Sequence, residues 1–387
     1  MRGPYVRFAI DIDYPPERFE LNRRRMEARG AFRYHDRVPV AFCVVPRYFA
    51  PIFGLTYSDF FKDVETQYYW QLQFAKYRME NIPEDIWCGP VVGVYPYFDN
   101  VVNASAFGAE IGWGADETPR AIPTVRTPDA ADALQMPEPT AGLWGKVLEW
   151  QARMTELAAE TRVTFAGQEG IVAVGPPSIG GEGPHMIAVD LVGEDLYWWQ
   201  VEHPDACHRL MDKITKGMIR AEESFREIDT RPRGGYGLAE DSAQIMSDRM
   251  FREFCVPYDC ALYDRFGAGL PDGRGMHMCG NSTHLLGSLK REERISSFNV
   301  FGYIVDPHDI ARELGGTTYL WGNIDPMLML NGSRTEVKEA AHRFLEVLAP
   351  CGGLMLGDGA NVCPGTPLAN LAALTEACQE YILPKAA

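Results

Sequence analysis

The C-terminal half of this chain alternates between short apolar runs and segments with helical periodicity, and this alternation limits the possible folds more than any other feature. The predicted pairs, each a strand followed by a helix, are 234–239 and 247–266, 273–279 and a short helix from 282, 297–305 and 306–314, 317–322 and a helix from 333, and 352–357 and a helix from 366. Because a connecting helix returns the chain to the same end of the sheet, this order predicts parallel strands.

Two of these helices have recognisable beginnings. Ser333 and Glu336 form the pattern of a capping box, in which each side chain bonds the backbone N–H of the other residue. Thr366 and Pro367 precede the last helix, and we expect Pro367 to occupy its first position, where a missing N–H breaks no hydrogen bond.

The N-terminal half is less regular. Its predicted elements are a helical lead-in at 1–37, a buried strand at 38–45, a helix at 58–80, a strand-like stretch at 85–88, an insertion with short strands at 95–145, and a loop rich in glycine and proline at 176–184. The insertion holds many prolines and few periodic apolar positions. It forms either a lid or rim over a functional site or a surface addition.

Composition restricts the class of protein. The 387 residues carry a formal net charge of −16, which argues against nucleic acid or an anionic membrane surface as a partner. No apolar run reaches the length of a membrane span, the N-terminus lacks the apolar segment of a secretory signal, and nine irregularly spaced cysteines fit a reducing compartment. We expect a cytoplasmic protein that forms a single domain over residues 1–387.

Polar side chains follow each of the five predicted strands. These residues are Glu240 and Asp241, then His277, Cys279 and Asn281, then Asp306, then Asn323 and Asp325, and finally Asp358, Asn361 and Cys363. In a closed (β/α)₈ barrel the carboxyl ends of the strands converge on one mouth, whereas the outer strands of an open sheet end too far apart to cooperate. We therefore predict an α/β protein of the TIM-barrel type, with an N-terminal helical extension and the insertion near residues 95–145.

His277 and Cys279 are the strongest candidates for metal ligands. They are two residues apart on a predicted strand, so both side chains point to one face. Imidazole nitrogen and thiolate sulfur are preferred ligands of Zn²⁺. Candidates for the third ligand are Cys363, Asp358, and the carboxylates Glu240 and Asp241. The alternative is a pair that only packs and forms hydrogen bonds.

Three segments resemble the uroporphyrinogen decarboxylase superfamily. They are His277-Met-Cys-Gly-Asn281, Leu320-Trp-Gly-Asn-Ile-Asp-Pro326, and Leu356-Gly-Asp-Gly-Ala-Asn-Val-Cys-Pro-Gly-Thr-Pro367 followed by Asn370-Leu371. Weaker matches at Arg37-Val-Pro-Val-Ala-Phe42 and Ala106-Phe-Gly-Ala-Glu110 extend the resemblance over nearly the whole chain. Members of this family are (β/α)₈ barrels, which agrees with the fold predicted from the pattern of strands.

The resemblance implies one of two activities. One branch decarboxylates the acetate side chains of a porphyrinogen without a cofactor, and binds this anionic substrate through a twin-arginine segment after the first strand. The corresponding stretch here, Cys43-Val-Val-Pro-Arg-Tyr48, has the single arginine Arg47. The other branch passes a methyl group between a corrinoid protein and a thiol, and its zinc ligands are an H-x-C pair and a distant cysteine. His277 and Cys279 match the pair, but Asp358 stands where the third cysteine is expected.

The resemblance thus favours a zinc-dependent methyltransferase that moves a methyl group between a corrinoid (methylcobamide) carrier protein and a thiol or small methylated substrate. The expected zinc ligands are His277, Cys279 and Cys363. The expected catalytic residues are Asp241, Asp358, Asn323 and Asp325. The expected substrate-binding residues are Arg47, Glu240, Asn281 and Asn361. The resemblance also suggests a homodimer.

Two other functions compete with this one. A decarboxylase or other lyase without a cofactor would act on a small carboxylate, with Asp358 or Asp241 as proton donor and Arg47 on the carboxylate. A barrel without catalytic activity would only bind a ligand or a partner. Polar residues at five strand ends are more than folding needs, which makes this last alternative the weakest.

Overall fold

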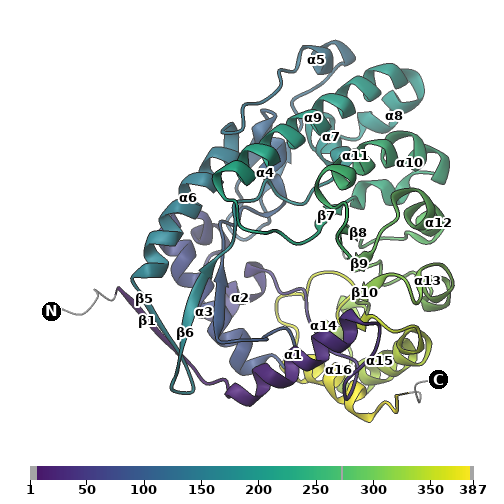
Figure 1. The fold of residues 1–387 in the computed structure, drawn as a ribbon. Coiled ribbons are helices and arrows are strands. Elements are labelled where there is room, and N and C mark those ends of the chain that lie inside the picture. The colour runs from purple at the N-terminus through teal and green to yellow at the C-terminus, as the bar shows by residue number, and fades with distance from the viewer. Residues whose placement is uncertain (1–6, 272, 384–387) are drawn as a thin grey trace.

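A parallel sheet of five strands forms the C-terminal half of the protein, as the alternation of segments predicts (Figure 1). The computed structural model describes residues 7–271 and 273–383. From one edge to the other the strands are β11 (Leu354–Met355), β10 (Tyr319–Trp321), β9 (Ser297–Asn299), β8 (Arg274–His277) and β7 (Tyr236–Ala239). All neighbours in this sheet pair in parallel, and every strand is shorter than the segment predicted for it.

Helices follow these strands and lie along the outer side of the sheet in Figure 1. They are α10 (Asp248–Phe254), α11 (Val256–Phe266), α12 (Leu286–Ser288), α13 (Pro307–Leu314), α14 (Pro326–Asn331), α15 (Arg334–Leu348) and α16 (Leu368–Glu380). The predicted helix 247–266 is divided at Cys255, because Pro257 has no N–H to continue the hydrogen bonding of the first helix. The capping box of α15 is confirmed by both of its hydrogen bonds. Pro367 is the N-cap of α16 and not its first residue, which corrects the prediction.

The N-terminal half contains a second sheet, in the order β1-β5-β6-β2. Its strands are β1 (Phe8–Ile12), β5 (Thr161–Phe165), β6 (Gln168–Val174) and β2 (Val91–Val94). The helices of this half are α1 (Pro16–Gly30), α2 (Pro46–Phe53), α3 (Val64–Asn81), α4 (Val102–Ala106), α5 (Pro128–Ala133), α6 (Gly142–Ala159), α7 (Pro184–Val192), α8 (Asp195–Glu202) and α9 (Pro204–Ile228). Two predictions are corrected: the lead-in at 1–37, whose residues 1–6 lie outside the described part, contains β1 before α1, and β2 begins after the strand-like stretch 85–88.

The predicted strand at 38–45 is reduced to a bridge. Val40 pairs in parallel with Leu356 beyond the end of β11, and its carbonyl accepts a hydrogen bond from Asp85 N. At the opposite edge of the sheet Glu182 pairs with β7. Within the described residues the paired strands form separate sheets and not a closed ring, so the structure confirms a mixed α/β fold with a parallel sheet. Closure of a barrel stays a prediction.

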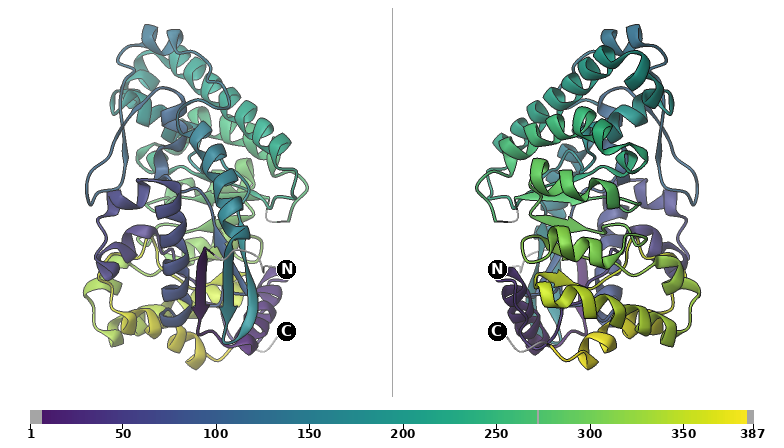
Figure 2. Two further views of the ribbon diagram at one scale, coloured as in Figure 1. Left: turned by 90° about the vertical axis from the view of Figure 1, so that its left-hand side faces the viewer. Right: turned by 90° about the vertical axis from the view of Figure 1, so that its right-hand side faces the viewer.

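The insertion at 95–145 is divided between two places. It contains the predicted short strands, β3 (Glu110–Gly112) and β4 (Arg120–Ile122), which form an antiparallel hairpin, together with α4 and α5. Its first residues, including Tyr97 and Asp99, line a central cavity. Helix α5 packs against α9 and projects at one end of the molecule (Figure 2). One part of the insertion therefore borders the cavity, and the other part is a surface addition.

A buried ionic network ties the first part of the chain to the core. The buried apolar side chains form one cluster that runs from Ile10 to Cys378 and includes residues of both sheets. Asp85, which is 3% exposed, accepts hydrogen bonds from Arg25 of α1 and from both terminal nitrogens of Arg37. It also accepts from the backbone N of Val40, so one carboxylate holds α1 and the segment beside β11. None of the described helices is long and apolar enough to cross a membrane.

Asp85→Asn is expected to destabilise the protein by about 3–5 kcal/mol, because it leaves the buried guanidinium of Arg37 without its counter-charge and leaves Arg25 with Asp36 alone. Urea denaturation followed by circular dichroism measures this free energy of unfolding. The matched control is Glu20→Gln on α1, which breaks only exposed ion pairs with Arg23 and Arg24 and should leave the denaturation midpoint unchanged. Equal midpoints for both variants would contradict the role given to Asp85.

Candidate functional site

The register of three parallel strands sets the geometry of the site. Ala239 of β7, His277 of β8 and Asn299 of β9 are direct neighbours in the sheet. On β8 the partly accessible residues Gly275 and His277 alternate with the buried Met276, so His277 points to the inner side. His277 Nδ1 lies 3.1 Å from Asn299 Oδ1. The amide oxygen accepts a hydrogen bond from Nδ1–H in this arrangement, which leaves the lone pair on Nε2.

Asp241, His277 and Cys279, here called the cavity group, bring three potential ligand atoms together. His277 Nε2 lies 3.6 Å from Asp241 Oδ2, and Asp241 Oδ1 accepts a 2.7 Å hydrogen bond from the backbone N–H of Cys279. The imidazole nitrogen, the thiol sulfur and a carboxylate oxygen all lie within 4.8 Å of one another. One nitrogen, one sulfur and one oxygen ligand at this spacing can hold an ion such as Zn²⁺.

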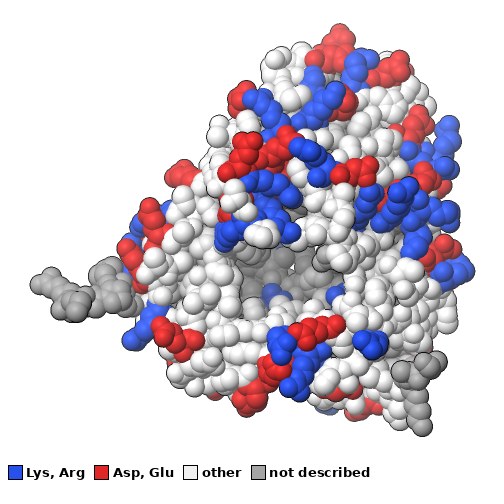
Figure 3. Space-filling model, viewed as in Figure 1, with Lys and Arg blue, Asp and Glu red and all other residues white. Residues whose placement is uncertain are grey.

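Asp241 and His277 of the cavity group line a cavity of about 560 Å³, and Cys279 lies behind them. Figure 3 shows the molecule hollowed at its centre, in the region between the N-terminal sheet and the five-stranded sheet. Asp241 and His277 line the cavity on one side, Tyr97 and Asp99 line it from the insertion, and Asn361 comes from the loop after β11. This volume is in the range of small-molecule sites, so the potential ligand atoms face a space that can hold a substrate.

Two thiols beside the cavity are protonated in the isolated chain. Burial, and then the charge of Asp241, raises the pKa of Cys279 to about 12. Burial, and then the charge of Asp358, raises the pKa of Cys43 to about 12, and the Cys43 thiol donates to Asn361 Oδ1 at 2.9 Å. Because zinc binds thiolates, metal binding at Cys279 would release its proton.

Asp358 and Asn323, two of the predicted catalytic residues, are fully buried and do not line the cavity. Asp358 Oδ1 accepts a 2.8 Å hydrogen bond from Cys43 N, and Asn323 Nδ2 donates to the carbonyl of Gly302 at 2.7 Å. Burial is the main cause that raises the pKa of Asp358 to about 7. Both residues join loops at the strand ends, and their remaining oxygens have no hydrogen-bond partner among the described residues.

The other predicted residues lie on loops around the mouth of the sheet. Asp325 is the N-cap of α14, and the side chain of Asn281 binds the turn that follows β8. Arg47, at the start of α2, donates to Thr118 of the insertion at 3.0 Å. Cys363 lies in the loop after β11 and is not among the ligand atoms that the cavity group brings together.

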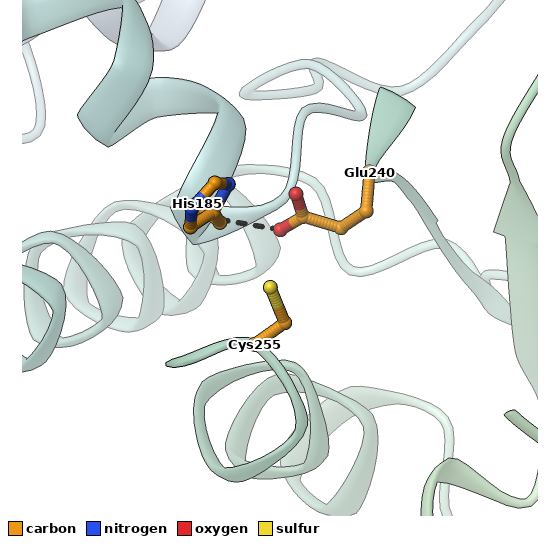
Figure 4. Close-up of side chains that lie close together, drawn as sticks. All are labelled: His185, Glu240 and Cys255. Carbon is orange, nitrogen blue, oxygen red and sulfur yellow. Dashed lines mark hydrogen bonds between the residues drawn. The ribbon is translucent and has the colours of Figure 1, made fainter. Parts of the chain in front are cut away.

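A second set of potential ligands, His185, Glu240 and Cys255, lies inside the core and is here called the buried group (Figure 4). Glu240 directly precedes Asp241 but points to the other side of the sheet, where it accepts hydrogen bonds from backbone N–H groups of α7 at 3.1 and 3.2 Å. Both ring nitrogens of His185 already have polar partners at 2.8 Å. A metal ion in this group would have to displace these hydrogen bonds.

The surroundings of the buried group favour uncharged side chains. Asp259 and Glu293 are fully buried beside Glu240, and the three carboxyl groups contact one another in sequence. Burial is the main cause that raises their pKa values, and it raises the pKa of Glu293 to about 8. Burial also lowers the pKa of His185 to about 4. The cavity group is therefore the more accessible of the two candidate metal sites.

Comparison with known proteins identifies the family of this chain. Residues 35–381 match the family described as Uroporphyrinogen decarboxylase (URO-D). The chain belongs to the uroporphyrinogen decarboxylase family. This result confirms the resemblance that the motifs after the strands indicate.

Similar members of the family are methyltransferases. Methylated-thiol–coenzyme M methyltransferase of Methanosarcina mazei is 24% identical over 308 residues, which cover 77% of this chain and 75% of the relative. Methylcobamide:CoM methyltransferase MtaA of Methanosarcina barkeri is 28% identical over 259 residues, which cover 64% and 72%. A solved structure of a methyltransferase from Methanosarcina mazei, 21% identical, aligns with a TM-score of 0.67 over 93% of this chain and 98% of that chain. The protein is thus a distant homologue of these methyltransferases and shares the fold.

Sequence reasoning about this family member missed Asn299 and Asp99. The predicted strand 297–305 ends at Asn299 in the structure, so the polar residue at its end is Asn299, and Asp306 is the N-cap of α13. The alternation of polar Ser297 and Asn299 around an apolar residue was the pattern that could have found it. Asp99 lies in the insertion at 95–145, in which the sequence shows no regular pattern.

Glu182→Gln tests how much stability the protein loses when the buried carboxyl group at the edge of the sheet is ionised. Burial raises the pKa of Glu182 to about 7 from its usual 4.5, and its carboxylate accepts from Asn103 Nδ2 at 2.7 Å. The folded state holds a proton that the unfolded chain releases, so stability should fall as pH rises from about 4.5 to about 7. Glutamine keeps the acceptor and removes this loss, on the order of 2–3 kcal/mol at pH 8.

Denaturation midpoints of both proteins across this pH range give the measurement. The two curves should coincide near pH 4 and separate above pH 5, with the variant more stable. Glu169→Gln on exposed β6 is the matched control and should follow the wild type at every pH. A wild type that gains stability relative to Glu182→Gln on going from pH 5 to pH 8 would contradict the assignment.

Proposed function

We propose that this protein is a zinc-dependent methyltransferase that moves a methyl group between a methylcobamide carrier and a thiol or small methylated compound. The observation that carries the proposal is the convergence of the His277 imidazole, the Cys279 thiol and the Asp241 carboxylate beside the cavity. The names of the relatives support the same class of reaction, because they describe methyl transfer from methylcobamide or a methylated thiol to coenzyme M.

The chemistry of the cavity group fits zinc. Catalytic zinc sites use three protein ligands and keep one position open to substrate. The three potential ligands here are only partly buried, and two of them, Asp241 and His277, line the cavity. Asn299 binds the ring nitrogen of His277 that does not face the group, as the hydrogen-bond partner of a metal-ligating histidine does. Asp241 supplies the third ligand in this proposal, in place of the cysteine that the family pattern has near Asp358.

Zinc, when bound, would supply a Lewis acid that holds a thiol substrate as its thiolate. The residues of the chain prepare that position. Asn299 keeps Nε2 of His277 directed at Asp241, and Asp241 holds the backbone of Cys279 through a 2.7 Å hydrogen bond. Both interactions fix the side chains before a substrate arrives, which lowers the entropic cost of the reactive arrangement.

The wider predictions from the sequence are part of this proposal. A closed (β/α)₈ barrel is supported by the bridges that extend the five-stranded sheet at both edges, Val40 with Leu356 and Glu182 with Ala239. A single domain over residues 1–387 is supported by the continuous apolar cluster. A corrinoid carrier protein as partner is supported by the word methylcobamide in the name of the MtaA relatives. We also propose a homodimer in the cytoplasm.

A cofactor-independent decarboxylase or lyase is the second candidate, and Asp358 is the observation that favours it. Its raised pKa gives a carboxyl group that holds a proton near neutral pH, as a proton donor requires. The residue is fully buried under the Cys43 amide, so a substrate would reach it only after local rearrangement. This placement ranks the decarboxylase below the methyltransferase.

Zinc analysis of the purified protein separates the two candidate metal sites. We expect about one zinc per chain. His277→Ala and Cys279→Ala should each lose it, because the remaining two ligands bind zinc weakly. Cys255→Ala in the buried group and Cys363→Ala in the loop should keep it. Inductively coupled plasma mass spectrometry after dialysis gives the ratio of metal to protein.

Two results would contradict this assignment. Zinc that remains in His277→Ala and Cys279→Ala but is lost in Cys255→Ala would place the metal in the buried group. A folded, metal-free wild type that also fails to take up added zinc would remove the methyltransferase proposal and favour the lyase.

Asn299→Ala is expected to weaken zinc binding and methyl transfer without removing them. Loss of the hydrogen bond to Nδ1 frees the His277 ring to rotate, and such outer partners are worth roughly 10–100-fold in metal affinity. Competition with a chromogenic chelator measures the affinity, and the absorbance of methylcobalamin in the presence of thiols follows transfer. Asn281→Ala, at the next polar position after β8, is the control and should keep wild-type affinity.

A further inference from the structure

The inner side of the sheet carries very small side chains. The inward positions of β7 and β8 include Gly237 and Gly275, and a β-carbon added at Gly237 would meet no atom within 4 Å. Branched side chains usually fill the interior of barrels of this kind. Here the space belongs to the cavity, which extends from the cavity group to Gly235 and Ser297 near the opposite ends of the strands. The substrate therefore has room for a body beyond the atom that meets the metal ligands.

A carboxylate and an aromatic ring border this cavity from the insertion. Asp99 and Tyr97 line it, whereas Tyr95, whose ring centroid lies 6.1 Å from that of Tyr97, lines a neighbouring pocket together with Arg78. The Tyr57 hydroxyl donates to Asp99 Oδ2 at 3.0 Å and fixes the carboxylate. Asp99 has a φ of 57°, a left-handed conformation that is uncommon for residues with a side chain. Strained backbone at a cavity wall is typical of functional positions. We call Asp99 and Tyr97 the Asp99 cage.

The charges around the cavity favour a cation. Among the described residues that line it, Asp99 and Asp241 are carboxylates and none is a lysine or arginine. Two arginines lie near the Asp99 cage, and both have other partners. Arg47, whose charge acts on Asp99, donates to a threonine of the insertion, and Arg78, which lines the neighbouring pocket beside Tyr97, binds both carboxylate oxygens of Glu84. Because Asp241 is a zinc ligand in the proposed enzyme, Asp99 is the carboxylate that remains to attract a cation and to repel an anionic group.

We propose that the thiol substrate carries a cationic head, a quaternary or protonated ammonium group, that binds between Asp99 and the ring of Tyr97 while its sulfur faces the cavity group. This inference rests on the proposed function, because it names the substrate class of the same site. Aromatic faces attract such cations through cation–π interactions, and the carboxylate adds a direct charge.

The transfer balances without a further reactant. The cobalt–carbon bond of methylcobamide breaks with its electron pair on cobalt, and a pair of the thiolate sulfur forms the new sulfur–carbon bond. The thiol proton passes to solvent. The cationic head takes no part in bond making, so it only positions the sulfur.

Binding of compounds that contain only the head group shows whether the cavity recognises the positive charge or the shape of the head. Choline and 3,3-dimethylbutan-1-ol have the same shape and differ by one positive charge. Isothermal titration calorimetry of the purified protein should show choline binding roughly tenfold or more tightly than the neutral alcohol. Equal affinities would overturn the cationic head, because the cavity would then recognise only the apolar surface.

Variants of the Asp99 cage locate this binding. Asp99→Asn and Tyr97→Leu should each weaken choline binding by roughly five- to thirtyfold, with thermal stability measured to show that the fold is kept. Asp195→Asn, which removes an exposed carboxylate in the first turn of α8, is the matched control and should bind choline as the wild type does. Unchanged affinity in Asp99→Asn would overturn the site.

Thiols that differ only in the head group test which substrate class the enzyme prefers. The same comparison shows whether the cationic head or the methyltransferase activity is the part of the proposal that fails. Thiocholine, 3,3-dimethylbutane-1-thiol and 2-mercaptoethanesulfonate are compared as methyl acceptors from methylcobalamin. Thiocholine should have the highest kcat/KM, and Asp99→Asn should raise its KM roughly tenfold while zinc content is unchanged. A preference for the sulfonate would overturn the cationic head and leave the methyltransferase in place. Choline binding without zinc or transfer to any thiol would overturn the methyltransferase and leave the cation site.

Discussion

In-register parallel pairing of β7, β8 and β9 is the constraint on which the rest of this structure depends. It sets Ala239, His277 and Asn299 side by side. Asp241, two residues after Ala239 in the chain, therefore lies beside the imidazole of His277. A slip of one residue in any of these strands would turn every side chain to the other face of the sheet. The register is held from the outer side, where the buried Leu238, Met276 and Phe298 of the same strands belong to the apolar cluster.

Stability and site use opposite faces of the same sheet. The outer faces of the strands pack against helices, and apolar burial there supplies the main favourable free energy. The inner faces of β7 and β8 carry Gly237 and Gly275, which add no packing and cost backbone entropy on folding. Because these two positions are glycines, the interior is left with a cavity instead of packed side chains. The buried network of Asp85 with Arg25 and Arg37 holds the segment that closes one edge of this cavity.

The sequence predicts the parallel strands and two members of the cavity group, His277 and Cys279, as ligands because these follow from local patterns. His277 and Cys279 share a face through the two-residue period of a strand, and Asp241 directly follows a predicted strand. Asn299 was missed because the apolar residues after it continued the strand pattern, although they turn away after β9. The predicted third ligand, Cys363, was chosen as a cysteine in the loop after the last strand, and no local pattern says where a loop residue points. The role of Asp99 depends on contacts with Tyr57, which is far from it in sequence.

Glu240 and Asp241 show how one strand end can serve two environments. Consecutive residues leave an extended chain in opposite directions, so Glu240 enters the core between α7 and α11 while Asp241 enters the cavity. In the core a carboxyl group is stable only when it is neutral, and burial raises the pKa of Glu240 well above its usual value. In the cavity a carboxylate can keep its charge and meet a cation from solvent. The core around Glu240 therefore suits hydrogen bonds within the fold, and the cavity at Asp241 suits an exchangeable metal and a charged substrate.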